Sequence, residues 1–124
     1  MTLLLVLLGA AVGAPLRYLI DLLVQSCHDS VFPWGTLTVN AVGSVLIGAT
    51  AGALAAEPGP GWVLPLLGVG LCGALTTFST FGVETVRLAQ QGSLLAATAN
   101  TIGSVAVCLG GCAGSYSLAR VLAG

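Results

Sequence analysis

Three long stretches of this chain carry no charged side chain. Residues 35–56 and 62–83 are 22 residues each, and residues 91–119 are longer still. As α-helix at ~1.5 Å per residue, 22 residues extend about 33 Å. That length matches the hydrocarbon core of a bilayer, which is about 30 Å thick. The sequence therefore predicts helices that cross a membrane.

The composition leaves too few charged residues for a water-exposed surface. Only 6% of the 124 residues are charged, 56% are hydrophobic and the mean hydropathy is +1.06, whereas a soluble domain carries roughly 25% charged residues. The chain has one domain's length, so we expect a single all-α integral membrane domain over 1–124. With a net charge near zero and no basic patch, nucleic acid is not an expected partner.

A fourth span is predicted at residues 2–24, although Arg17 and Asp21 interrupt it. These two side chains are spaced i, i+4 and can pair on one helix face. A cleaved signal peptide is the alternative for "LLLVLLGAAVGA", but no basic residues precede it. The expected spans are about 2–24, 35–56, 62–83 and 91–119, joined by short connections at 26–34, 57–61 and 87–90.

The distribution of arginines gives almost no preferred orientation. With four spans, both termini and the 57–61 connection share one side, where Arg120 is the only basic side chain. The other side has Arg87, plus Arg17 if that residue reaches the interface. Orientation follows the Lys/Arg bias between loops, so we expect insertion both ways and pairing of opposite copies. The alternative is that one extra arginine suffices to orient the chain.

Several motifs are better explained by packing than by chemistry. The pairs Gly9/Gly13, Gly48/Gly52 and Gly110/Gly114 are G-x-x-x-G patterns that let helix backbones approach closely. Residues 68–73, "GVGLCG", match a dinucleotide fingerprint but lack the preceding strand and the distant acidic residue that it needs. Cysteines 27, 72, 108 and 112 are expected to be unpaired and packed rather than disulfide-bonded or metal-bound. No catalytic residues and no enzyme are predicted.

Two asparagines lie inside the predicted spans, in a faint internal repeat. "VNAVGSV" at 39–45 recurs as "ANTIGSV" at 99–105, so Asn40 and Asn100 occupy equivalent positions. An amide in hydrocarbon is costly unless it is hydrogen-bonded. Each asparagine is therefore expected either to bond a neighbouring helix or to line a polar pathway.

The segment "GALTTFSTFG" at 73–82 concentrates four hydroxyls within five residues. Threonines in helices often bond back to the i−4 carbonyl, but four hydroxyls after several glycines favour an interruption of the third span in mid-membrane. Carbonyls freed by such a break would suit a small cation such as Na⁺. Phe78 and Phe81, spaced i, i+3, could offer positive ring edges to an anion, or could simply pack against a neighbour.

Four stretches together resemble the Fluc/CrcB fluoride channels. They are "GAPLRY" (13–18), "PWGTLTVNAVGSVLIG" (33–48), "GLCGALTTFSTFGVET" (70–85) and "NTIGS" (100–104). The resemblance implies a dual-topology antiparallel homodimer in the bacterial inner membrane, with two fluoride pores that reduce fluoride toxicity. It also implies a structural Na⁺ at the dimer interface, bound by backbone carbonyls of the broken third helix.

The resemblance assigns roles to residues of this chain. The Na⁺ carbonyls correspond to Gly73 and Thr76, the fluoride-coordinating rings to Phe78 and Phe81, and the pore amide to Asn40. The remaining assignments are a fourth-helix polar track (Asn100, Ser104), nearby hydroxyls (Thr77, Ser79) and pore-mouth residues (Arg17, Glu84). Some family members carry Tyr at the position of Asn100 and a hydroxyl at that of Cys108, so the track differs at its outer end.

Two alternative functions are weighed against a fluoride channel. A small multidrug-type dual-topology transporter also has four short helices, but it needs a carboxylate midway along the first span, and residues 2–16 contain none. A membrane scaffold that transports nothing would not need polar groups concentrated at a helix break. The sequence thus predicts a passive channel for a small, strongly hydrogen-bonding anion.

Overall fold

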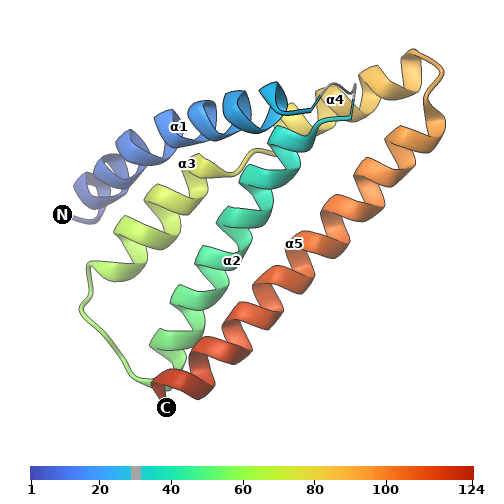
Figure 1. Ribbon diagram of the computed structural model, residues 1–124. Helices are drawn as coiled ribbons and strands as arrows, with labels where there is room; N and C mark the ends of the chain where they lie inside the picture. The colour runs from blue at the N-terminus through green and yellow to red at the C-terminus, as the bar shows by residue number, and fades with distance from the viewer. Residues whose placement is uncertain (29–31) are drawn as a thin grey trace.

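The computed structural model describes residues 1–28 and 32–124, and this part of the chain is helical without strands. The predicted connection at 26–34 includes Asp29, which lies outside the described residues. The elements in order are α1 (Thr2–Ser26), α2 (Trp34–Ala56), η1 (Leu64–Cys72), α3 (Gly73–Leu75), α4 (Ser79–Gln90) and α5 (Leu94–Ala123). Figure 1 shows α2 between the η1–α3 segment and α5, with α1 lying along η1 and α3.

Four helical segments of the described chain are long and apolar enough to cross a membrane. They are Thr2–Ser26, Trp34–Ala56, Leu64–Gln90 and Leu94–Ala123. The third segment is a composite, because η1 is π-helical and is followed by α3 and then by α4. π-Helical segments are rare and are often found at functional sites. The all-helical class and the four apolar helices predicted from the sequence are thus observed.

The last connection lies further along the chain than the sequence suggested. Residues 87–90 are helical, and the turn falls at 91–93. Gly92 adopts φ +83° and donates its N–H to Ala89 O, while Ser93 donates to Leu88 O at 2.9 Å. This is a Schellman termination, which favours glycine in the left-handed conformation. The charges at Glu84 and Arg87 therefore do not mark the end of the helix.

Glycines set the two closest helix contacts. Gly9 and Gly13 of α1 face backbone atoms of η1, at Leu66 and Leu71. On the other side of the bundle, Gly48 and Gly52 of α2 lie against the α5 backbone; their nearest partners are Cys112 and Tyr116. At all four positions a Cβ atom would overlap a neighbouring main chain. These contacts match the packing role predicted for the first two G-x-x-x-G pairs.

The third G-x-x-x-G pair does not make a contact within this chain. A Cβ atom on Gly110 or Gly114 would meet nothing within 4 Å among the described residues. Arg17 and Asp21 also differ from expectation, since no ion pair joins them in the described structure. Asp21 instead faces Gly35 at the start of α2, so α1 and α2 approach closely at that end.

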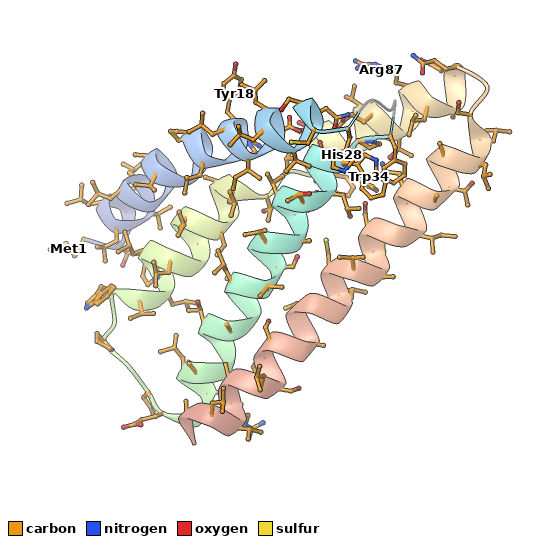
Figure 2. The ribbon with its side chains drawn as sticks, viewed as in Figure 1. Met1, Tyr18, His28, Trp34 and Arg87 are labelled. Carbon is orange, nitrogen blue, oxygen red and sulfur yellow. The ribbon has the colours of Figure 1, made fainter. Side chains whose placement is uncertain are left out.

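The distribution of polarity is the reverse of a soluble fold. The residues buried with polar side chains are Thr36, Asn100 and Ser104, whereas large apolar side chains are exposed along α1, α2, η1, α4 and α5. Figure 2 shows Tyr18 projecting outward from α1 and Arg87 projecting from the end of α4. Soluble monomers rarely expose such continuous apolar surface. This exterior suits lipid or a partner that is equally apolar.

Aromatic side chains gather at one end of the bundle. The His28 ring stacks on Trp34 with centroids 5.4 Å apart, and Phe32 lies 4.7 Å from the same indole. In Figure 2 His28 and Trp34 lie together where α1 ends and α2 begins. Trp and Tyr are enriched where membrane meets water, so this cluster indicates one interface of the bilayer.

The glycine contacts predict opposite effects for two single-methyl changes. Gly52→Ala should lower the free energy of unfolding by about 1–3 kcal/mol, because the added Cβ overlaps the α5 backbone. Gly114→Ala should leave it unchanged or raise it by up to about 1 kcal/mol, because the site is open and Ala favours helix. Thermal unfolding in detergent checks both, and equal destabilisation would contradict the assigned contacts.

Candidate functional site

The helix is interrupted at Thr76, Thr77 and Phe78, between α3 and α4. Thr76 has φ −84° and ψ 159°, an extended conformation that ends the helical turns after Leu75. The Thr76 side chain still bonds back to its own turn, since Oγ1 donates to Cys72 O at 3.0 Å. Helical hydrogen bonding resumes with Gly82 N–H to Phe78 O. A segment of three residues therefore carries backbone groups that the helices do not satisfy.

Asn40 of α2 binds this segment at two points. Its Nδ2 donates to Thr77 O at 2.9 Å, and Thr77 N–H donates to Asn40 Oδ1 at 2.7 Å. The side-chain amide thus replaces the peptide group that a continuous helix would have supplied. Gly43, almost one turn further along α2, has no side chain, and the Thr76 methyl group occupies that space. Both expectations for Asn40 remain compatible, because an amide nitrogen has a second N–H.

The same bonds release two carbonyl oxygens. In an α-helix Gly73 O would accept from Thr77 N–H, and Thr76 O from Thr80 N–H. Thr77 N–H is bound instead to Asn40 Oδ1, and Thr80 N–H to Thr77 Oγ1 at 3.2 Å. Gly73 and Thr76 therefore lose their helical partners. They are also the two residues to which the family resemblance assigns the Na⁺ carbonyls.

An open cavity of about 520 Å³ lies beside the interruption. Its floor is α2, one wall is η1 with the interrupted segment, and α5 contributes the opposite wall. Of the residues predicted from the sequence, those that line it are Asn40, Gly73, Thr76, Thr77, Phe78, Phe81 and Ser104. No charged side chain is among the lining residues that the structure describes. The cavity therefore offers neutral donors, carbonyls and aromatic rings.

Phe78 and Phe81 lie together at this cavity. Their ring centroids are 5.9 Å apart and the rings are tilted by 50°, so they are neither stacked nor coplanar. Phe78 is 84% exposed, in contrast to the usual burial of a phenylalanine. The i, i+3 spacing thus brings the two rings to one side, as the sequence indicated, and leaves Phe78 uncovered by its own chain.

A chain of hydrogen bonds leads from α5 to α4 behind the cavity wall. Ser104 Oγ donates to Asn100 Oδ1 at 3.3 Å, and Asn100 Nδ2 donates to Thr85 Oγ1 at 2.8 Å. Thr85 Oγ1 in turn donates to Phe81 O at 2.8 Å. Asn100 is only 1% exposed and does not line the cavity. Asn100 connects Ser104 to the backbone that carries Phe81.

Thr85 and Thr36 were not singled out from the sequence. Thr85 completes the chain from Asn100, and buried Thr36 donates its hydroxyl hydrogen to Glu84 Oε1. The sequence gives little indication of either role, because threonines are common in the apolar stretches of this chain. The spacing of Thr85 from Phe81, i+4, was a usable clue, because it places the hydroxyl over that carbonyl.

The remaining predicted site residues, Glu84, Arg17 and Ser79, are not among those that line the cavity. Glu84 is half-buried near Thr36 and Asp21 at the end where α1 meets α2, and Arg17 is partly exposed on α1. Ser79 is exposed, with its Oγ 3.5 Å from Thr77 Oγ1. All four cysteines are free thiols. Cys72 and Cys108 line the cavity, whereas Cys27 is exposed at the end of α1.

Four helices long and apolar enough to cross a bilayer define a multi-pass membrane protein, and sequence comparison identifies its family. Residues 4–116 match the family model described as "CrcB-like protein, Camphor Resistance (CrcB)", and the chain belongs to this family. A relative from Frankia casuarinae, named fluoride-specific ion channel FluC 1, is 54% identical, with 98% of each chain covered. Similar relatives named fluoride-specific ion channels occur in Streptomyces avermitilis (53% identity, 86% of each chain) and Paramagnetospirillum magneticum (43% identity, 85% of this chain and 84% of the relative). The resemblance seen in the four sequence stretches is confirmed.

The hydrogen-bond chain behind the cavity predicts a destabilised Thr85→Val variant. Valine keeps the shape of threonine but removes the acceptor of Asn100 Nδ2, a donor that is fully buried. An unpaired buried donor costs about 1–3 kcal/mol, and thermal unfolding in detergent measures the loss. Thr50→Val is the matched control, because Thr50 bonds only to Leu46 O of its own helix. Equal losses in both variants would contradict the role given to Thr85.

Proposed function

We propose that this chain forms a fluoride-selective channel, through which F⁻ leaves the bacterial cytoplasm passively across the inner membrane and so lowers fluoride toxicity. The observation that carries the proposal is the cavity at the interrupted helix, where the Asn40 amide and the Phe78–Phe81 pair meet without a fixed charge. The names of the similar relatives support the choice of fluoride as the anion. The first alternative, a small multidrug-type transporter, is not favoured by these relatives or by the carboxylate-free half of α1.

The anion would be held by groups that replace its water shell. Asn40 Nδ2 donates one hydrogen to Thr77 O, and its second hydrogen can bind an anion in the cavity. The edges of aromatic rings carry partial positive charge, so Phe78 and Phe81 can face F⁻ without trapping it by a full charge. Exchange of hydration for protein ligands, weak enough to allow release, is a general basis of channel selectivity.

A structural Na⁺ bound by Gly73 O and Thr76 O is part of the proposal. The two carbonyls fit this ion, because both have lost their helical N–H partners to Asn40 and Thr77 side chains. Freed carbonyls in a membrane helix are tolerated only where protein or water covers them, and broken membrane helices commonly present such oxygens to Na⁺. The bound ion would supply positive charge and fix the ends of α3 and α4.

We further propose that two copies assemble as an antiparallel, dual-topology homodimer. The interruption falls near the midpoint of the Leu64–Gln90 segment, which supports a position in mid-membrane. A second copy would cover the open side of the cavity and the exposed Phe78 ring. Arg120 lies near one end of the bundle, and Arg87, plus Arg17 if it reaches the interface, near the other, so the bias for a single orientation is close to nil.

Fluoride efflux from liposomes tests the function directly. Reconstituted protein should release F⁻ and exclude Cl⁻, because chloride is larger and more weakly hydrogen-bonding. Phe81→Ile should abolish the fluoride flux and leave the elution volume of the assembled protein unchanged, since isoleucine fills space but lacks a ring edge. Absence of fluoride flux in the wild-type protein, or equal passage of chloride, would refute the channel. Loss of folding in Phe81→Ile would instead favour a packing role for that ring.

The proposed Na⁺ predicts a cation dependence. Protein purified with N-methylglucamine in place of Na⁺ should unfold at a lower temperature and should regain stability when Na⁺ is added, because the organic cation is too large for two helix-end carbonyls. K⁺ at equal ionic strength is the control for general salt effects. Identical unfolding temperatures in Na⁺, K⁺ and N-methylglucamine would argue against a sodium site.

A further inference from the structure

Ser44 reaches the same cavity as the predicted site residues. In the internal repeat, Ser44 follows Asn40 by four positions on α2, as Ser104 follows Asn100 on α5. Both serines line the cavity, from its floor and from its α5 wall. The two asparagines differ, because Asn40 lines the cavity and Asn100 is buried behind it. The repeat therefore brings two hydroxyls, but only one amide, to the cavity.

Two other cavity hydroxyls donate their hydrogens within the protein. Thr76 donates to Cys72 O, and Ser104 donates to Asn100 Oδ1. Thr77 Oγ1 lies 3.5 Å from Ser79 Oγ and accepts from Thr80 N–H. Ser44 has no hydrogen-bond partner among the described residues, and it is only half-buried at the cavity. Its hydroxyl hydrogen is thus free to bind a ligand.

Ser44 differs from two other hydroxyls of α2. Serine and threonine in membrane helices commonly bond back to a carbonyl one turn earlier. Thr38 and Thr50 of the same helix do so, with Trp34 O and Leu46 O as acceptors. Ser44 lies between them and does not. Ser44 lines the cavity, whereas Thr38 and Thr50 do not.

We propose that Ser44 donates a hydrogen bond to the permeating anion and forms the binding position next to Asn40. This inference rests on the proposed fluoride channel. Residues i and i+4 of a helix lie about 6 Å apart at Cβ, a distance over which a small anion can pass from one donor to the next. Beyond Ser44 the cavity is lined by Ile47, Gly68 and Leu109. Ser44 is therefore the last free donor on the α2 side before an apolar stretch.

The test compares fluoride efflux from liposomes for four proteins. Ser44→Ala should reduce the efflux rate at least about tenfold, because a hydrogen bond to a charged ion is lost. Ser44→Thr keeps the hydroxyl and should retain most of the flux. Thr50→Ala removes a hydroxyl of the same helix outside the cavity and should behave like the wild type. Elution volume and unfolding temperature of each variant show that the fold is intact.

Each outcome separates this inference from the function on which it rests. Fluoride flux in the wild type with an unchanged Ser44→Ala rate would overturn the role of Ser44 and leave the channel standing. An equal loss in folded Ser44→Ala and Ser44→Thr would show that side-chain shape matters rather than the hydroxyl, and would also overturn it. If the wild type carries no fluoride, the channel itself is wrong.

Discussion

The amide of Asn40 bound to both backbone groups of Thr77 is the interaction on which the site depends. A helix interrupted in an apolar environment leaves polar backbone groups that cannot be hydrated, and each costs free energy if it stays unpaired. Asn40 satisfies the N–H and the C=O of one peptide residue at 2.7 and 2.9 Å. The carbonyls of Gly73 and Thr76 remain without their helical N–H partners. Carbonyl oxygens of this kind are suited to a cation.

Close packing without large side chains makes this geometry possible. Gly43 lets the interrupted segment approach α2, and Gly48 and Gly52 bring α5 to the opposite side of the same helix. The cavity is consequently lined by α2, by α5 and by the composite segment from η1 to α4, which approach closely because α2 carries glycine at the contacts. The arrangement of the helices around the cavity follows from close backbone contacts. No ionised side chain is among the described residues that line the cavity.

The amount that sequence alone predicts varies with the physical cause. Charge-free windows give the four helices directly, since lipid imposes their length and composition. Asn40 stands out in the sequence because an amide inside an apolar span is costly unless it is hydrogen-bonded. Phe78 and Phe81 stand out because they lie i, i+3 apart within a segment rich in hydroxyls. The turn at 91–93 depends on the conformation of Gly92, and the lack of a neighbour among the described residues at Gly110 and Gly114 could not be predicted from their spacing. Spacing gives a clue to Thr85 and the internal repeat gives one to Ser44, but their surroundings are seen only in the structure: Thr85 accepts from Asn100, and Ser44 lines the cavity.

The near-equal ends of the bundle have a consequence for how much assembled protein a cell obtains. If copies insert at random and only opposite copies pair as proposed, the share of productive encounters is twice the product of the two orientation frequencies. That product is greatest when the frequencies are equal. In that proposal Arg87 and Arg120, one near each end of the bundle in a chain without lysine, would keep the frequencies close together. Under the proposed dual topology, the scarcity of basic residues would determine the ratio of the two orientations, in addition to making the helices soluble in lipid.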